Sequence, residues 1–254
     1  MEQKPEKKLY GSVLLKAATI LDTLAQEGGK SIQELSNATA ITPSNLSKIL
    51  ETLIHVGYVI RDQSKLYYLG SKFMKYNTQN IEVERLLAVS KPYLEALRTE
   101  LNETIHLSVL ENQEVVYIDK LEPQNQGIYM TSKIGLSRPL YSSGMGKAIL
   151  STFSEAEIDA YLNQTPLVAF TQNTITTAEL LRADLAAIRA RGFSIDDEEQ
   201  EDGGYCVATT IEGQGRVIGA MSISFPKFRL SPDYQQQVVA QLKATKARLE
   251  NELN

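Results

Sequence analysis

The chain has few residues that could form covalent or metal crosslinks. Its 254 residues include one cysteine, Cys206, and two histidines, His55 and His106, which lie far apart in the sequence. A single cysteine excludes an internal disulfide framework, which fits a reducing cytoplasm. So few potential ligands give little support to a zinc site or a Cys–His catalytic pair, and we expect both histidines to be structural.

Long apolar segments are absent as well. No run of about 18 apolar residues occurs, so the sequence predicts no membrane-spanning helix and no membrane partner. Residues 14–18 resemble the apolar part of a signal peptide, but Lys16 interrupts them, and Ile20, Leu21 and Leu24 continue a helical stripe. We therefore expect a soluble cytoplasmic protein, which at this length can form two domains with real cores.

Residues 31–70 contain the helices of a helix-turn-helix. A first short helix carries Ile32 and Leu35 on one face, and Ile41 lies in the following turn as an apolar plug. Thr42 suits the N-cap of a second helix, and Pro43 suits its first helical position. An apolar stripe at spacings of three, one and three then marks the buried face of this second helix: Leu46, Ile49, Leu50 and Leu53.

A β-hairpin follows these helices. Gly57 permits a left-handed C-cap, residues 58–60 and 66–69 form two short strands, and residues 62–65 form the turn. Lys65 lies at the tip of this hairpin. The order of two helices, turn and hairpin predicts a winged helix-turn-helix, in which the hairpin is the wing.

The residues expected to contact DNA are polar and lie at the start of the second helix or at the tip of the wing. They are Thr42, Ser44, Asn45, Ser47, Lys48 and Lys65. A recognition helix presents its amino-terminal part to the major groove, where such side chains bind base edges or phosphates. The alternative is a small α+β module that binds another protein, because a fold alone does not determine function.

Charge is distributed unevenly along the chain. Residues 1–75 hold ten basic and seven acidic residues, a net charge of +3, whereas residues 76–254 have a net charge of −8. We therefore expect DNA to bind the first part, with a salt-sensitive affinity that is weak for one copy and favours two copies on a palindromic operator. Lys4, Lys7 and Lys8 form either an arm along the DNA backbone or a solvated tail.

The polar residues 72–80 mark a boundary. Residues 81–90 have helical periodicity, and Pro92 begins a fresh helical segment that ends near Leu101. We divide the chain into a winged helix-turn-helix domain, a linker helix and a second domain, and these comprise residues 1–75, 76–91 and 92–254.

The second domain alternates between strand and helix patterns. Strands are expected at residues 105–110, 115–118, 205–211 and 216–225. Helices are expected from Gly144, from the capping boxes of Ser154 with Glu157 and Thr176 with Glu179, and from Ser231. The second of these capping boxes opens a helix that ends at Gly192. The pattern predicts an α+β domain with an antiparallel sheet flanked by helices.

Three segments of the chain resemble the IclR (isocitrate lyase regulator) family of bacterial transcription factors. They are the winged helix ending in Leu69-Gly70, residues 138–150 (RPLYSSGMGKAIL), and residues 191–199 (RGFSIDDEE) leading to 206–208 (CVA) and 221–224 (MSIS). The resemblance covers nearly the whole chain. It implies a GAF-like effector domain that binds a small carboxylate metabolite, a homodimer or dimer of dimers, and repression of a catabolic operon, with no enzymatic activity and no cofactor.

The resemblance also implies a pocket for the carboxylate, built from Gly144, Met145, Asp196, Cys206, Ser222 and Ser224. A glycine-flanked helix start can hold an anion through backbone N–H groups, although glycines there also permit close packing. The two serines share one sheet face, which is either solvated or a wet pocket. Cys206 taken alone is a small buried hydrophobe. Met145 is bulkier than the residue often found at its position in the family, and Lys48 replaces a common Arg, which favours a phosphate contact.

The sequence does not match two more specific binding motifs, a phosphate loop and a calcium loop. Gly146-Lys147 resembles a phosphate loop, but Tyr141 and Ala148 occupy the positions where that motif needs Gly and Ser or Thr. The acidic residues 196–202 lack the spacing of a calcium loop, so we expect no metal there and a solvated loop except at Asp196. The alternatives to a regulator are a GAF-like enzyme or sensor with an accessory module, for which Cys206 has no partner cysteine, and a protein-binding scaffold.

Overall fold

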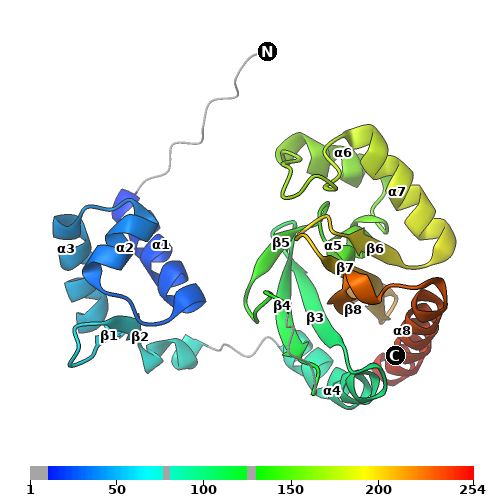
Figure 1. Cartoon of the computed structure of the whole chain (residues 1–254), viewed down its shortest axis with the longest axis horizontal. Helices are drawn as coiled ribbons and strands as arrows, with labels where there is room; N and C mark the ends of the chain where they lie inside the picture. The colour runs from blue at the N-terminus through cyan, green and yellow to red at the C-terminus, as the bar shows by residue number, and fades with distance from the viewer. Residues whose placement is uncertain (1–10, 77–80, 125–129) are drawn as a thin grey trace. The chain divides into compact units, whose positions relative to one another are not determined.

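A computed structural model describes residues 11–76, 81–124 and 130–254. The chain separates into two compact units, Met1–Gln79 and Asn80–Asn254, here called the amino-terminal and carboxy-terminal units (Figure 1). The expected arm of Lys4, Lys7 and Lys8 lies outside the described residues. Among the described segments, no helix is both long and apolar enough to cross a membrane.

The amino-terminal unit is a winged helix-turn-helix, as predicted. Its elements are α1 (Ser12–Glu27), α2 (Ile32–Thr39), α3 (Pro43–His55), β1 (Val59–Arg61), β2 (Tyr67–Leu69) and the 3-10 helix η1 (Ser71–Tyr76). The stripe of α3 packs with Ile20, Leu24 and Leu35 into one core, and Ile41 is buried in the turn. Pro43 occupies the first turn of α3 and Gly57 has a φ of 84° after its end. Thr42 is the N-cap residue, but its side chain makes no cap hydrogen bond.

The carboxy-terminal unit contains a six-stranded antiparallel sheet, which confirms the predicted α+β class. The strand order is β5-β4-β3-β8-β7-β6, so β3 and β8 are central (Figure 1). The strands are β3 (Thr104–Glu111), β4 (Glu114–Leu121), β5 (Ser137–Pro139), β6 (Ser194–Asp197), β7 (Gly204–Gly213) and β8 (Arg216–Pro226). The edge strands β5 and β6 were not predicted from the sequence.

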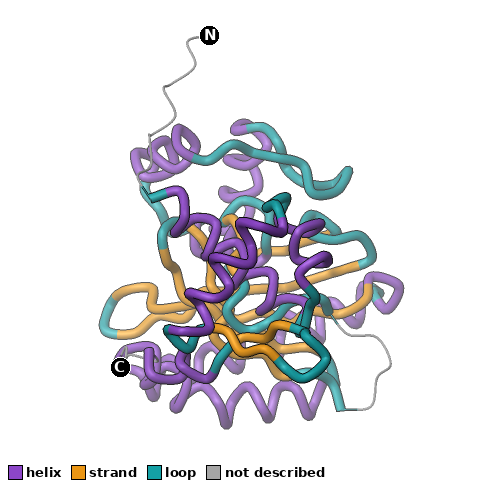
Figure 2. Tube along the Cα trace, turned by 90° about the vertical axis from the view of Figure 1, so that its left-hand side faces the viewer, coloured by secondary structure: helices purple, strands orange, loops and turns teal. Residues whose placement is uncertain are grey.

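Helices cover both faces of this sheet, and Figure 2 shows the strands between the helical layers. On one face, α4 (Ile81–Leu101) and α8 (Pro232–Leu253) pack on the side chains of Ile105, Leu107 and Ile223. On the other face lie α5 (Gly144–Leu150), α6 (Glu155–Gln164) and α7 (Ala178–Arg191), with a core that includes Ala208 and Ala220. Because alternate residues of a strand face opposite sides, the polar residues between the apolar ones of β3 and β8 point towards α5.

Two local predictions are wrong. The helix does not break at Pro92, because α4 runs continuously through it and belongs to the carboxy-terminal unit. Packing of α4 on the sheet and on α8 outweighs the cost of about 3 kcal/mol that proline imposes within a helix. The N-cap of α7 is Thr177 and not Thr176, since the Thr177 side chain accepts the N–H of Leu180.

Candidate functional site

The polar start of α3 forms one exposed surface on the amino-terminal unit. Thr42, Ser44, Asn45 and Lys48 are exposed, and Ser47 is half-buried beside them. Lys65 is exposed in the β1–β2 turn, where its backbone has a φ of 64° and the Asp62 carboxylate accepts the N–H of Leu66 at 2.8 Å. The opposite side of α3 is the buried stripe, so all six predicted DNA-contact residues are available to a groove or a phosphate.

A small cavity of about 40 Å³ lies in the carboxy-terminal unit on the face of the sheet that α5 covers. Each strand contributes one lining side chain to it: His106, Tyr117, Arg138, Asp196, Cys206 and Ser224. The remaining lining comes from Met130 and Ser132, which precede β5, and from Gln200, Glu201 and Gly204 around the β6–β7 loop. The strand order therefore brings together groups that are far apart in the sequence.

Three of the six predicted effector residues line this cavity directly: Asp196, Cys206 and Ser224. Ser222 reaches it through a hydrogen bond to His106. Gly144 lies behind the cavity, because a Cβ added there would be 3.5 Å from Cys206 Cβ and 3.6 Å from Asp196 Cβ. Met145 is buried in the core beneath the sheet, where its Sδ accepts the Ser108 hydroxyl at 3.2 Å.

Close packing explains the neighbouring glycine of α5. A Cβ at Gly146 would come within 2.5 Å of the Leu140 backbone, so only glycine fits there. Its N–H donates to the Ser143 hydroxyl at 3.2 Å and is therefore already satisfied. The packing interpretation of the glycines thus holds at Gly146.

His106 is the centre of a buried polar network that the sequence analysis missed. Its Nε2 lies 2.6 Å from Ser132 Oγ, and its Nδ1 lies 3.1 Å from Ser222 Oγ and 3.2 Å from Ser224 Oγ. Burial, reinforced by the Lys120 charge, lowers the pKa of His106 to about 3, so the ring is neutral. Ser222 is 3% exposed and Ser224 is 1% exposed, which rules out the interpretation that these two serines face solvent.

The network continues to Cys206, whose Sγ lies 2.9 Å from Ser224 Oγ. Burial raises the pKa of this thiol well above its ordinary value, so very little thiolate is present at neutral pH. Because the thiolate is the nucleophilic form, a catalytic role for Cys206 is disfavoured.

Asp196 forms the acidic wall of the cavity. One of its carboxylate oxygens accepts the backbone N–H groups of Glu199 at 2.8 Å and Gln200 at 3.4 Å, which shapes the β6–β7 loop. Burial raises the pKa of Asp196 to about 6, although these two hydrogen bonds and Lys147 oppose the shift. The same loop is tied across the cavity by a hydrogen bond from the Thr131 hydroxyl to the Glu201 carboxylate.

The acidic residues 196–202 are not solvated throughout beyond Asp196, which corrects our expectation. Glu199 is buried and pairs with Lys147 of α5, a side chain that is only 1% exposed. The Lys147 Nζ also lies 2.8 Å from Asp184 of α7, and the second Glu199 oxygen has no hydrogen-bond partner among the described residues. Burial raises the pKa of Glu199 to about 7 despite its ion pair with Lys147. The ion pair therefore anchors the loop that lines the cavity.

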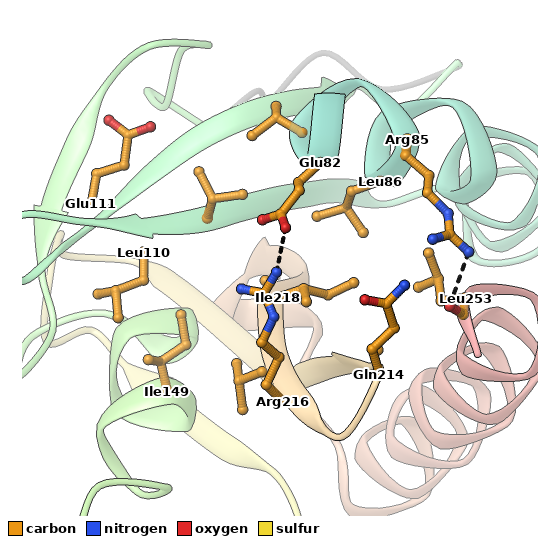
Figure 3. Close-up of a pocket in the computed structure, with 15 residues that line it drawn as sticks. Glu82, Arg85, Leu86, Leu110, Glu111, Ile149, Gln214, Arg216, Ile218 and Leu253 are labelled. Atoms are coloured by element: carbon orange, nitrogen blue, oxygen red, sulfur yellow. Dashed lines mark hydrogen bonds and ion pairs between the residues drawn. The ribbon is translucent and has the colours of Figure 1, made fainter. Parts of the chain in front are cut away.

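A larger cavity of about 350 Å³ lies elsewhere in the carboxy-terminal unit, where β3 and β8 diverge beyond the Ser108–Ala220 pair (Figure 3). Its floor is apolar, with Leu86, Leu110 and Ile149 among its residues. Its two arginines already have partners, because Arg216 pairs with Glu82 and Arg85 donates to the Leu253 carbonyl (Figure 3). Polar groups converge in the smaller cavity, which makes it the candidate ligand site.

No group of three or more potential metal ligands is found within the described residues. The residues that line the small cavity offer hydrogen bonds and charges. This cavity can hold a compact polar molecule among a neutral imidazole, hydroxyls, two carboxyl groups and an arginine.

Comparison with known families covers both units. Residues 13–63 match the model described as the IclR helix-turn-helix domain, and residues 78–250 match the model of the bacterial transcriptional regulator IclR C-terminal domain.

Individual relatives agree with these matches. The chain is 32% identical over 251 residues to the HTH-type transcriptional regulator KdgR of Dickeya chrysanthemi, covering 95% of this chain and 80% of that protein. It is 30% identical over 226 residues to the transcriptional repressor IclR of Escherichia coli, covering 87% of this chain and 82% of that protein.

A solved structure shows the same fold. It is an IclR homologue from Microbacterium hydrocarbonoxydans in complex with 4-hydroxybenzoate, which matches with a TM-score of 0.77 at 21% identity over 95% of this chain and 98% of that one.

Proposed function

The chain belongs to the IclR family of bacterial transcriptional regulators, and from this premise we propose that it is a repressor of a catabolic operon whose operator binding responds to a small carboxylate metabolite. The observation that carries the proposal is the convergence of six strands' polar side chains on one buried cavity, in a different unit from the exposed face of α3. One unit thus offers a ligand site and the other a DNA-reading surface. The protein acts in the cytoplasm, where its operator lies.

The DNA-reading surface works in pairs. The net charge of +3 for residues 1–75 provides few phosphate contacts per copy, so a homodimer, or a dimer of dimers, on a palindromic operator supplies the affinity. Ser44, Asn45 and Ser47 bind base edges or phosphates from α3, while Lys48 and Lys65 bind phosphates.

The effector acts by shifting a population of arrangements. A ligand can change operator affinity only if it binds one arrangement of the paired chains more tightly than another. Asp196, Cys206, Ser222 and Ser224 contact the effector or hold the groups that do, and Gly144 and Met145 support the wall behind them. The bound 4-hydroxybenzoate of the Microbacterium homologue is a carboxylate, which supports this ligand class.

Replacing Lys48 with alanine should weaken operator binding several-fold and lower the dependence of log K on log salt concentration by about 1 per copy, because one phosphate contact per α3 is lost. The measurement is fluorescence anisotropy on the upstream region of the chain's own gene at several salt concentrations. Lys48→Arg should keep the slope, since it keeps the charge.

The matched control is Lys243→Ala, which removes an exposed lysine from α8 of the other unit and should leave both affinity and slope unchanged. An unchanged slope for Lys48→Ala would remove Lys48 from the contact set. If the wild type binds no fragment of the upstream region, the DNA-binding proposal itself is rejected.

Asp196→Asn should reduce the affinity for the effector at least about tenfold while operator affinity stays within about twofold, because the substitution removes a charged acceptor from the cavity wall only. Carboxylate substrates of the enzymes encoded beside the gene are titrated by calorimetry, and operator release is followed by anisotropy. Asp197→Asn is the control, since Asp197 projects from the opposite face of β6 and pairs with Lys227. A normal titration of Asp196→Asn would count against this pocket.

A further inference from the structure

We propose that Arg138 selects the charge of the effector by binding its anionic group, an inference that deepens the proposed function and rests on it. Arg138 lines the small cavity from β5, at the opposite edge of the sheet from β6. The effector is thereby defined as a small hydroxy acid, with its carboxylate on Arg138 and its hydroxyl groups towards Asp196.

Arg138 is half-buried in the wall of this cavity. Within the described ranges it makes no hydrogen bond and no ion pair, although Asp196 and Glu201 line the same cavity. A guanidinium presents five N–H donors in a planar fork that matches a carboxylate. Several other arginines of the unit are paired, as Arg229 is with Glu103 and Arg182 with Asp159. The guanidinium of Arg138 therefore has donors available for a ligand in this cavity.

The cavity wall opposite Arg138 suits a different part of the ligand from its carboxylate. One Asp196 oxygen accepts two backbone N–H groups, and the other has no partner among the residues the structure describes. Glu201 adds a second carboxylate to this side. An anionic group would be repelled here, whereas a hydroxyl can donate a hydrogen bond to a carboxylate. Between the walls lie neutral groups, the His106 ring and the Ser224 hydroxyl, which suit neutral polar atoms of the ligand.

The start of α5 is a weaker anion site than Arg138. The helix has only seven residues, neither Gly144 nor Met145 is among the cavity-lining residues, and the Gly146 N–H is satisfied by Ser143. A bidentate arginine–carboxylate pair is charge-assisted and about twice as strong as a neutral hydrogen bond. The carboxylate therefore binds at β5, and the helix start supplies packing.

Matched ligand pairs test this assignment on the full-length protein. Lactate, D-gluconate and 4-hydroxybenzoate are each compared with their own amide, which removes the charge, and with propionate, hexanoate or benzoate, which lack the hydroxyl groups. Binding is measured by thermal unfolding over a concentration series and by calorimetry for each compound that shifts the transition. At least one hydroxy acid should bind, and its amide and its deoxy acid should each bind at least about tenfold more weakly.

The variant Arg138→Gln should lose at least about tenfold in affinity for the hydroxy acid and should no longer distinguish the acid from its amide. Loss of the acid-over-amide preference, and not loss of affinity alone, is the signature, because a merely structural arginine would weaken both ligands alike. Arg216→Gln is the control in the same unit, since its exposed guanidinium belongs to the other cavity, and it should keep the preference.

Three results would overturn the assignment: amides that bind the wild type as tightly as their acids, a preference that survives in Arg138→Gln, or no binding by any acid of the panel. Operator binding without ligand separates this failure from that of the proposed function. If the wild type binds its operator while the panel fails, only the Arg138 assignment falls, whereas a wild type that binds no DNA removes the regulator proposal.

Discussion

Replacing Lys147 with methionine should destabilise the carboxy-terminal unit by about 3–5 kcal/mol at pH 7, the usual cost of removing one partner from a buried ion pair. The Lys147 side chain is 1% exposed and pairs with both Glu199 and Asp184. Methionine has a similar length and fills the space, so the loss reflects charge and not a cavity. The measurement is the urea midpoint of the transition in which the carboxy-terminal unit unfolds.

Protonation of Glu199 limits this loss of stability, so the pH dependence of unfolding tests its cause. With Lys147 present, burial already raises the pKa of Glu199 to about 7, and without Lys147 the pKa rises further because the ammonium that favours the carboxylate is gone. The variant then keeps Glu199 protonated, at a cost that falls by about 1.4 kcal/mol for each pH unit below 7. Below pH 7 the wild type protonates Glu199 as well, so the destabilisation should change little between pH 7 and pH 5.5 and should grow above pH 7, where the wild type ionises Glu199 and the variant does not.

A second substitution identifies the group responsible. Lys147→Met combined with Glu199→Gln should recover most of the lost stability, because the buried charge that was left unpaired is removed. The control is Arg182→Met on α7, whose pairs with Glu155 and Asp159 are exposed and contribute less than about 1 kcal/mol. A double variant as unstable as the single one would show that Lys147 acts through packing.

The winged helix could be predicted because its signals are local. The stripe of α3, the proline at its start and Gly57 after its end all lie within a segment of about 40 residues, and each reflects the conformation of its own backbone. The antiparallel hairpin of β3 and β4 was predictable for the same reason, since Asn112 and Gln113 form its turn with positive φ values.

The site was only partly predictable because its groups meet through strand pairing. Asp196, Cys206 and Ser224 were named from the family resemblance, whereas His106 was expected to be structural and Arg138 was not singled out. The register pairs His106 with Ser222 across β3 and β8, two polar residues on the face that also holds Ser224. A polar residue between Ile105 and Leu107 could have signalled this, but only once the partner strand was known.

The acidic run shows a similar limit. Residues 196–199 look like a solvated loop when only the neighbouring sequence is considered, since isolated charges avoid burial. Glu199 is buried because Lys147, which is 52 residues away in the sequence, lies beneath it. At Pro92 the local signal for a helix start was equally sound, and the packing of α4 against α8 and the sheet outweighed it.

The neutral state of His106 predicts that acid weakens the carboxy-terminal unit. An unfolded histidine has a pKa of about 6.5, whereas burial lowers the pKa of His106 in the folded chain to about 3. Between these pH values the unfolded state binds more protons than the folded state. The contribution of His106 to stability is thus complete above pH 6.5 and is lost as the pH falls to about 3, by on the order of 4 kcal/mol.

Comparison with His106→Gln isolates this effect. Asp196 and Glu199, whose folded pKa values are raised, titrate in the opposite sense but are present in both proteins, so their contributions largely cancel in the difference. At pH 7 the variant should be the less stable protein, because a neutral imidazole bonds Ser132, Ser222 and Ser224 better than an amide does. As the pH falls from 6.5 to 4, the wild type should lose this advantage and become the less stable of the two.

Urea unfolding at half-unit steps of pH gives the difference directly. His55→Gln is the matched control, because it removes an exposed histidine from α3 and leaves the pocket intact. A difference between wild type and His106→Gln that stays constant from pH 7 to pH 4 would mean that the folded chain protonates His106 as readily as the unfolded chain. The ring would then be a cation in the cavity, and the effector's anionic group would have a second candidate partner beside Arg138.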